Sequence, residues 1–212
     1  MTSIVHHIPD HLLLSYASGS LPQPFSLVVA AHVSMCDECR ARLGAHEGAG
    51  GVLLERSDPI ILSESAKNSI LSRLDDTVAE LEPVHERSGI FPSPVMQALN
   101  GLPPKWKSLG MGARQSILEE NNEGSVRLLY IPAGQAVPDH GHNGLELTLV
   151  LQGAFSDETG RYGAGDVEIA DADLEHTPTA EEGEPCICLA ATDASLRFNS
   201  WVPRLLQPLF RI

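Results

Sequence analysis

The 212 residues suffice for one large or two small domains, and a hydrophobic fraction of 42% indicates a globular protein. The four cysteines form two close pairs, a spacing that is not typical of a disulfide-stapled secreted scaffold. No charged and apolar leader opens the sequence and no apolar run approaches membrane-spanning length, so we expect no membrane association and a cytoplasmic location.

The net charge of −14 is spread over both halves of the chain, with −6 on residues 1–82 and −9 on residues 106–212. Non-specific affinity for nucleic acid is built from Lys and Arg, so direct binding to nucleic acid is not expected and a zinc-dependent DNA-binding regulator is disfavoured. An acidic field favours encounter with a basic protein partner. It can also serve solubility alone, and charge by itself does not choose between the two.

Three short helices are predicted at the start of the chain. The first begins at Asp10 and ends before Gly19, because glycine suits the C-terminal cap. An apolar stretch at residues 25–33 and a segment at residues 36–43 form the next two, and glycines at 44, 48, 50 and 51 then interrupt the helical pattern. Three short helices cannot bury a large core, so this unit needs further stabilisation.

The segment between the second and third helices carries a metal-binding pattern, His32-x3-Cys36-x2-Cys39. Thiolate and imidazole are preferred zinc ligands, and Cys-x2-Cys lets two sulfurs reach one ion where a helix begins. His32 lies four positions before Cys36 and faces the same way on a helix. The fourth ligand can come from the pair His6-His7, and the energy of zinc binding would stabilise the unit. The alternative is a reduced cysteine pair beside a surface histidine.

A fourth helix is predicted to begin after Ser63, a good N-cap, and to end before Pro83. It carries an apolar stripe at helical spacing, formed by Ile70, Leu71, Leu74, Val78 and Leu81. Such a stripe commonly packs internally. Because a flexible connector separates this helix from the metal-binding unit, the stripe can instead close on a partner as a helix-in-groove contact.

The run of Asp10-x-Leu-Leu-Leu-x-Tyr-Ala-x-Gly-x-Leu followed by His32-x3-Cys36-x2-Cys39-Arg resembles the zinc-binding anti-sigma domain of proteins that sequester extracytoplasmic-function sigma factors. The resemblance covers residues 1–82. It implies an all-α unit of three helices plus a detached fourth, which together clamp the sigma factor and block its binding to core polymerase. It also implies that His7, with the histidine and two cysteines of the motif, binds zinc, and we choose His7 over His6 for its distance from the first helix.

Residues 83–105 are rich in proline and are interpreted as an inter-domain linker, with room for one helical turn at residues 96–99. Beyond it, residues 106–212 change to short β-like runs separated by turn residues, as an all-β barrel or jelly roll requires. These runs are residues 127–131, 145–151, 166–170 and 186–190.

The β half contains a second metal-binding pattern, His140-x-His142-x3-Glu146, followed later by His176. Histidines two apart on a strand share a face, and a carboxylate on the return strand can complete the site. Three histidines and a glutamate suit Zn²⁺, Mn²⁺ or Fe²⁺, and zinc is our first choice. The alternative is that these are surface residues of unrelated strands.

The spacing from Gly134 to Gly153 resembles the first motif of the cupin fold, and His176 matches the histidine of the second. An anti-sigma domain joined to a C-terminal cupin is similar to the ChrR group of anti-sigma factors. The resemblance implies a 1:1 heterodimer with a group IV sigma factor. It further implies a response to singlet oxygen or related oxidants in which the cupin domain senses and does not bind the sigma factor.

Cys186 and Cys188 lie two apart on a predicted strand, so both thiols face the same way. They can approach the cupin metal, or they can be inert core residues, which is the commoner fate of a buried cysteine. A redox switch is a further hypothesis, although a disulfide across one intervening residue is strained.

The chain is expected not to be an enzyme. The alternative is a metal-dependent cupin enzyme such as a dioxygenase, in which the cupin ligands hold iron and the N-terminal zinc unit serves as an attachment module. Obvious acid or base residues around the ligands are lacking beyond the acidic loop of residues 171–175.

Overall fold

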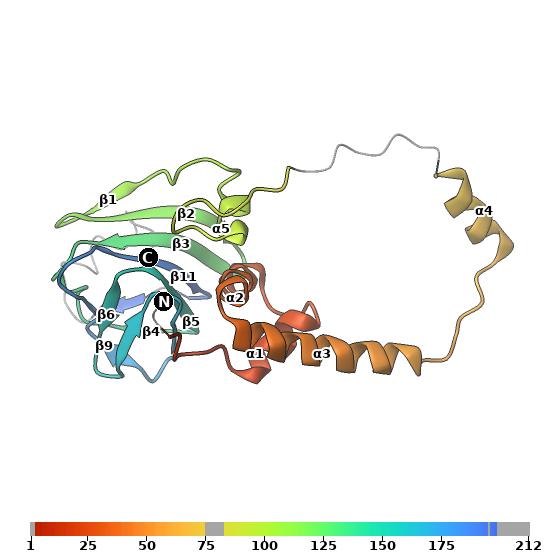
Figure 1. Cartoon of the computed structure of the whole chain (residues 1–212), viewed down its shortest axis with the longest axis horizontal. Helices are drawn as coiled ribbons and strands as arrows, with labels where there is room; N and C mark the ends of the chain where they lie inside the picture. The colour runs from red at the N-terminus through yellow and green to blue at the C-terminus, as the bar shows by residue number, and fades with distance from the viewer. Residues whose placement is uncertain (1–2, 75–82, 195, 199–212) are drawn as a thin grey trace.

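The computed structural model describes residues 3–74, 83–194 and 196–198 (Figure 1). Its helices precede its strands along the chain. The helices are α1 (Asp10–Ala17), α2 (Gln23–Met35), α3 (Asp37–Glu55), α4 (Glu64–Ser72) and α5 (Ser93–Ala98). The strands are β1 (Lys107–Gly110), β2 (Ala113–Asn121), β3 (Gly124–Ile131), β4 (His140–His142), β5 (Glu146–Gln152), β6 (Ala154–Ser156), β7 (Arg161–Gly163), β8 (Val167–Ala170), β9 (Glu175–His176), β10 (Thr179–Ala180), β11 (Cys186–Thr192) and β12 (Leu196–Phe198).

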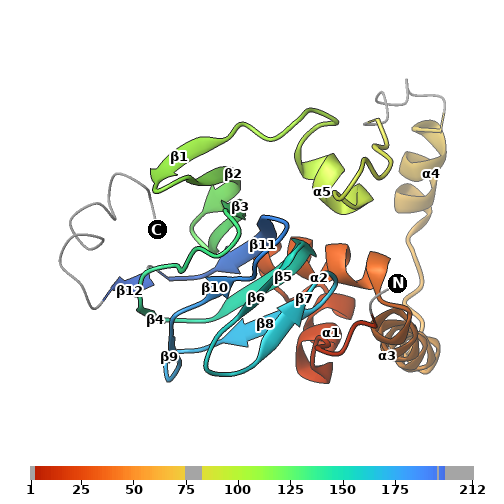
Figure 2. The same ribbon diagram turned by 60° about the vertical axis from the view of Figure 1, so that its left-hand side comes forward.

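The β half consists of antiparallel strands in one large and two small sheets (Figure 2). The large sheet has the strand order β1-β2-β3-β11-β5-β8, and the small sheets have the orders β10-β6-β7 and β12-β4-β9. The four β-like runs of the sequence lie in β3, β5, β8 and β11, which confirms the all-β prediction for this half. The last long strand, β11, pairs with β3 on one side and with β5 on the other, so it lies in the interior of the large sheet.

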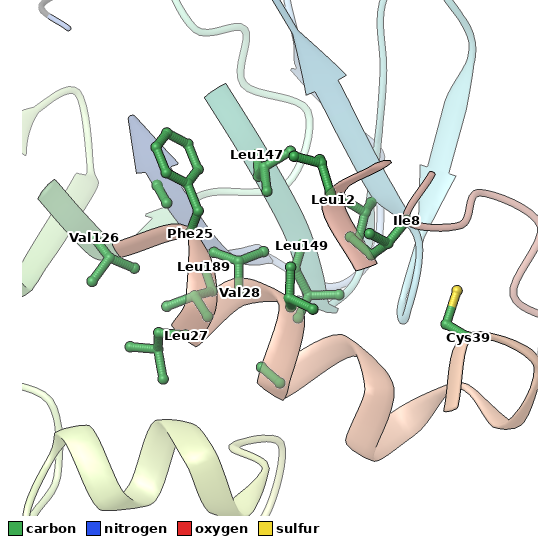
Figure 3. Close-up of a cluster of buried hydrophobic side chains, with 14 of the residues drawn as sticks. Ile8, Leu12, Phe25, Leu27, Val28, Cys39, Val126, Leu147, Leu149 and Leu189 are labelled. Atoms are coloured by element: carbon green, nitrogen blue, oxygen red, sulfur yellow. The ribbon is translucent and has the colours of Figure 1, made fainter. Parts of the chain in front are cut away.

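Helix α2 connects the two halves of the molecule. It packs against β3, β5 and β11, and it also contacts α5. Phe25 and Val28 of α2 belong to the same buried cluster as Leu147, Leu149 and Leu189 of the β-sheet (Figure 3). Full burial of one such side chain contributes about 1.5–3 kcal/mol to stability. The helical half is therefore fixed on the barrel by a shared hydrophobic core.

Helix α3 is longer than the sequence pattern predicted. The expectation that its glycines end the helix at Leu43 is wrong, because α3 continues to Glu55. A glycine within a helix is less favourable than alanine by about 1 kcal/mol, which weakens a helix without breaking it once packing has fixed the first turns. Cys39 and Leu43 are the buried residues of α3. The second half of the helix therefore projects away from the core (Figure 1).

Helix α4 stands apart from the body of the molecule (Figure 1) and buries none of its residues. Ser63 caps its N-terminus as predicted, since the hydroxyl accepts a hydrogen bond from the amide of Ala66 at 3.1 Å. The helix ends at Ser72, so Leu74 lies in the turn that follows. Val78 and Leu81 of the predicted stripe lie outside the described residues.

The segment interpreted as a linker contributes to the shared core. It contains α5, whose Val95 is fully buried in the cluster that includes α2. The middle of this proline-rich segment is thus a short helix that packs against α2. In the described ranges, no helix combines the length and the apolar character needed to cross a bilayer.

Candidate metal centres and apolar surface

Four side chains from three segments meet beside the junction of α2 and α3. One donor atom each of His7, His32, Cys36 and Cys39 lies within 4.8 Å of the others. Nδ1 of His7 is 3.3 Å from Sγ of Cys36 and 3.7 Å from Sγ of Cys39. These are the four residues that the sequence analysis named as candidate zinc ligands.

The local fold explains how the two sulfurs come together. Cys36 ends α2 and is the N-cap of α3, with extended backbone angles of φ −111° and ψ 110°. The amide of Cys39 donates a hydrogen bond to Sγ of Cys36 at 3.4 Å. A sulfur at the N-cap thus takes the place of the usual capping oxygen, and the first turn of α3 brings the second sulfur to the same side.

His32 is fully buried, and its two ring nitrogens have different surroundings. Nδ1 donates to the carbonyl oxygen of Gly165 at 2.9 Å, whereas Nε2 is buried with no hydrogen-bond partner. Burial lowers the pKa of His32 to about 4, so the ring is neutral at physiological pH. A neutral imidazole with its Nδ1 proton bound to a carbonyl and a buried, unsatisfied Nε2 suits metal coordination.

The neighbouring histidines 6 and 7 take different roles. His7 directs Nδ1 toward the sulfurs, and its Nε2 lies 3.4 Å from Oε2 of Glu38, which can orient the ring. His6 lies next to Asp166 of the β half, with Nδ1 3.6 Å from Oδ2. The cluster therefore includes His7 and leaves His6 at the contact between the two halves.

The donor set fits a tetrahedral zinc ion. Two sulfurs and two imidazole nitrogens are a common combination in closed structural sites. Burial raises the pKa of Cys39 to about 11 even though Nη1 of Arg42 lies 4.0 Å from its sulfur, so the thiol keeps its proton unless a metal ion binds it. A bound zinc ion would stabilise the thiolate and satisfy the buried Nε2 of His32.

The β half contains a cavity of about 430 Å³ whose lining is largely apolar. Its polar lining includes His140, Glu146 and His176 of the second metal-binding pattern. The rings of His140 and His176 lie with their centroids 4.7 Å apart, on the paired strands β4 and β9. His142 is on β4 as predicted, and its side chain is outside the described part of the structure.

The two described histidines of this cavity are each oriented through Nδ1. His140 Nδ1 donates to the carbonyl oxygen of Pro138 at 2.9 Å, and His176 Nδ1 lies 2.6 Å from Oδ2 of Asp157. In both rings Nε2 is therefore the nitrogen suited to bind a metal. Glu146 lines the same cavity. Imidazole and carboxylate are ligands that Zn²⁺, Mn²⁺ and Fe²⁺ all accept, so these three residues stay candidate ligands of a metal in this cavity.

Two carboxylates near His176 were not anticipated from the sequence. Oε1 of Glu168 lies 3.1 Å from Nδ1 of His176, and Asp157 is close enough to both residues to form a second possible metal-binding group. Burial raises the pKa of Glu168 to about 7. Burial lowers the pKa of His176, but the two carboxylates outweigh it and raise the value to about 9. Glu168 follows an apolar residue on a strand, so the sequence pattern did not predict that its carboxylate would be buried.

A buried cation also faces this cavity. Arg127 lines it and donates to Oε1 of Gln115 at 3.0 Å and to the hydroxyl of Ser125 at 2.6 Å. Burial lowers the pKa of Arg127. Its position within the apolar run of β3 gave no indication that its side chain would point inward.

Cys186 and Cys188 are buried in the wall of the same cavity. Their sulfurs lie 3.4 Å apart and both thiols are free. The contact with Cys186 and burial raise the pKa of Cys188 well above its ordinary value. Both side chains point the same way, as expected for residues two apart on a strand.

The outer half of α3, the connector and α4 expose a continuous series of large apolar side chains. We call this region, residues 52–74, the apolar arm. Its exposed apolar residues are Val52, Leu53, Leu54, Ile60, Ile61, Leu62, Ile70, Leu71 and Leu74. Isolated exposed apolar residues are ordinary, but such a concentration on one segment is typical of a protein-binding surface.

Both halves of this chain resemble known proteins. Residues 102–195 match the family described as the ChrR cupin-like domain. The chain is thus a two-part protein in which a helical unit with a His/Cys cluster is joined to a cupin-like barrel. The anti-sigma-E factor ChrR of Cereibacter sphaeroides is 55% identical over 212 residues, covering 99% of this chain and 100% of the relative. The chain belongs to the ChrR family of anti-sigma factors.

A solved structure agrees with this assignment. The crystal structure of Rhodobacter sphaeroides SigE in complex with the anti-sigma ChrR has a TM-score of 0.79 and 54% sequence identity to this chain. The match covers 90% of this chain and 100% of the other. The likeness therefore extends over the helical unit and the barrel together.

Proposed function

We propose that this protein binds an extracytoplasmic-function (group IV) sigma factor in the cytoplasm as a 1:1 heterodimer and prevents it from engaging core polymerase. The observation that carries the proposal is the full-length relative, an anti-sigma-E factor, together with the related ChrR that was crystallised with SigE. The net charge of −14 also suits a basic protein partner.

The helical unit and the apolar arm form the sigma-binding surface in this proposal. Ile70, Leu71 and Leu74 are exposed in the isolated chain and would be covered in the complex. Burying them against the sigma factor would provide hydrophobic stabilisation and would occupy surfaces that polymerase also needs. Inhibition is then competition for the same surfaces of the sigma factor.

Zinc held by His7, His32, Cys36 and Cys39 has a structural role in this proposal. It would supply the positive charge that keeps two buried thiols ionised, and it would fix the angle between α2 and α3. The N-terminal segment, α2 and α3 would then present the sigma-binding surface in one arrangement. The close approach of four donor atoms supports this assignment.

The cupin half is the sensor in this proposal, and it responds to singlet oxygen or related oxidants. His140, His142, Glu146 and His176 would hold a second metal ion, with zinc preferred over manganese or iron. The apolar cavity around three of these residues supports a role in admitting a small reactive species or molecule. A regulator of this kind needs no enzymatic activity.

The proposal is tested by recovering partners of the full-length protein from its native cytoplasm and measuring the mass of the complex. We expect a sigma factor at equal stoichiometry with wild-type protein, and none with His32→Ala/Cys36→Ala. His140→Ala/His176→Ala should still bind the sigma factor but should no longer release it under photosensitised singlet oxygen. Failure to recover a sigma factor, together with iron and oxygen consumption by the purified protein, would favour the enzyme instead.

A further inference from the structure

The segment that carries His7 is attached to the turn between β7 and β8 of the barrel. The amides of Val5 and His6 donate to Oδ1 of Asp166 at 2.7 and 2.9 Å. The carbonyl of His6 accepts a hydrogen bond from the amide of Val167 at 3.3 Å. Two backbone donors and one backbone acceptor thus hold the chain immediately before the candidate zinc ligand.

Asp166 is buried, and its second carboxylate oxygen fixes the turn itself. Oδ2 accepts a hydrogen bond from the amide of Gly163 at 2.8 Å. One side chain therefore binds the barrel turn through one oxygen and the N-terminal segment through the other. Hydrogen bonds to a charged acceptor are stronger than bonds between neutral groups.

Gly165 of the same turn contacts the other half of the zinc cluster. Its carbonyl oxygen accepts the Nδ1 proton of His32 at 2.9 Å, which leaves Nε2 as the coordinating nitrogen. Its φ of +98° lies in the left-handed region, and a Cβ at this position would lie 2.6 Å from Cδ1 of Ile4. The positive φ therefore favours glycine at this position, and a Cβ here would also force the Ile4 side chain to move.

We infer that Gly165 and Asp166 of the cupin barrel are positioning residues for the zinc site of the helical unit, so that the two halves of the protein are coupled through this turn. Gly165 sets the tautomer and orientation of His32, and Asp166 holds the segment that places His7. The inference rests on the proposed zinc site. It assigns to two cupin residues a role in binding a metal in the other half.

The turn is also hydrogen-bonded to β5 of the barrel. The amide of Gly165 donates to the carbonyl of Val150 at 2.8 Å, and the amide of Val150 donates to the carbonyl of Asp166 at 3.0 Å. Val150 packs in the buried cluster that contains Cys186 and Cys188. Two positions beyond Asp166, Glu168 lines the cavity beside His176.

This arrangement gives a physical route from one site to the other. A displacement of β5 or β8 at the cavity would move a turn that is hydrogen-bonded to Val150 on one side and to the N-terminal segment and His32 on the other. The same movement would shift the acceptor of His32 and the anchor of the segment before His7. Loss of the partner that orients a metal-binding histidine typically weakens metal affinity by about 10–100-fold. A local change in the barrel would therefore loosen the zinc-dependent unit.

The test uses Co²⁺ as a spectroscopic substitute for zinc in the full-length protein. Thiolate-to-cobalt charge-transfer absorption reports the site with two cysteines, since the second pattern contains no thiolate. A Cys36→Ser control should lose intensity in this band and thereby assign it. We expect Asp166→Ala to lower cobalt affinity by about tenfold or more, in line with the effect of orienting residues. Asp193→Ala is the matched control, since Asp193 also holds a backbone amide, that of Leu145 at 2.9 Å.

The outcomes separate the inference from the proposed zinc site. A wild-type charge-transfer band with unchanged affinity in Asp166→Ala would overturn the inference and leave the zinc site standing. Absence of the band in wild-type protein would overturn both. If Asp166→Ala does not fold, the same affinity measurement is made on Asp166→Asn. This variant keeps one oxygen that can accept from the N-terminal amides and loses the oxygen that accepts from the amide of Gly163. An intermediate loss of affinity is expected for it, and an unchanged affinity would contradict the inference.

A reciprocal measurement follows from thermodynamic linkage. If the turn stabilises the zinc site, then zinc must stabilise the turn. Removing zinc with a chelator should increase hydrogen–deuterium exchange at the amides of Val5, His6 and Gly163. The amide of Lys105, which donates to the hydroxyl of Ser116 at 3.1 Å and adjoins neither proposed ligand set, should be unaffected. Equal exchange with and without zinc at the first three amides would overturn the inference.

Discussion

Nδ1 of His32 in α2 lies 2.9 Å from the carbonyl oxygen of Gly165 in the turn before β8, although 133 positions separate the two residues. The contact joins a candidate zinc ligand to the barrel. Since the His32 ring is fully buried, its polar atoms must be satisfied inside the protein. One nitrogen is satisfied by the barrel, and the other is placed for a metal ion.

Loss of a zinc ligand should destabilise the helical unit. In Cys36→Ser, a weaker ligand would replace a thiolate, and we expect a lower thermal unfolding temperature that no longer responds to a chelator. Structural zinc contributes on the order of 10 kcal/mol in small peptide modules. Here the effect should be smaller, because α2 also packs on the barrel. His11→Ala, at an exposed position in α1, is the control, and an equal loss of stability in that variant would contradict a specific role for the cluster.

Charged substitutions on the apolar arm should weaken sigma binding without unfolding the protein. Ile70→Asp and Leu71→Asp replace exposed side chains, so the free energy of unfolding should change by no more than about 0.5 kcal/mol. Each should reduce affinity for the sigma factor by about tenfold if the arm is covered in the complex. Titration calorimetry measures this, with the exposed Asn68→Asp as control. Unchanged affinity in both apolar variants would place the sigma-binding surface elsewhere.

Truncation of the shared core should destabilise both halves together. Phe25 of α2 is 2% exposed and lies in the cluster that includes residues of β5 and β11. Phe25→Ala should lower the free energy of unfolding by about 3–5 kcal/mol. Because the core is shared, helices and barrel should unfold in one denaturant transition. Leu53→Ala, at a 68% exposed position, should have little effect. Two separate transitions in wild-type protein would show that the halves are energetically independent.

The cysteines of the cavity wall should react slowly in the folded protein. Cys188 is buried, and the contact with Cys186 and burial keep its pKa well above the ordinary value. The reactive thiolate is therefore scarce, and iodoacetamide should modify neither residue until the barrel is unfolded. Mass spectrometry of digested protein measures the modification. Rapid alkylation of Cys186 in folded protein, or oxidant induction abolished by Cys186→Ser/Cys188→Ser, would support the redox-switch hypothesis.

The attachment of the N-terminal segment should depend on pH through Asp166. Burial raises the pKa of Asp166, but hydrogen bonds from the amides of His6, Val5 and Gly163 outweigh it and hold the pKa below 3.8. A lowered carboxyl pKa stabilises the folded arrangement above the ordinary value, and this contribution is lost as the pH falls through the lowered value. Protection of the His6 amide, corrected for intrinsic exchange, should therefore decrease below pH 3.8.

Asp166→Asn provides the control for this pH dependence. Its amide does not titrate in this range, so the specific decrease should be absent, whereas any general acid unfolding would remain. The same decrease in both proteins would assign the effect to other groups.

The sequence by itself determined the elements and the chemistry of the expected sites. The spacing of His32, Cys36 and Cys39 needs only a helix junction to bring its donors together, and such local geometry can be read from periodicity. Ser63 was recognised as a cap for the same reason. The short β-like runs of the β half, separated by turn residues, likewise predicted strands, because turn residues and strand-forming residues act through local backbone geometry.

Only the tertiary structure decided how the two halves are joined. Alternation along β8 suggests that Glu168 faces solvent, yet it is 3% exposed and contacts His176, whereas Ile169 is 37% exposed. The partner of His32 is a backbone carbonyl, which no residue type reveals. The length of α3 also depended on packing of its first turns. Long-range contacts set these features, because the burial of a side chain depends on what the rest of the fold brings against it.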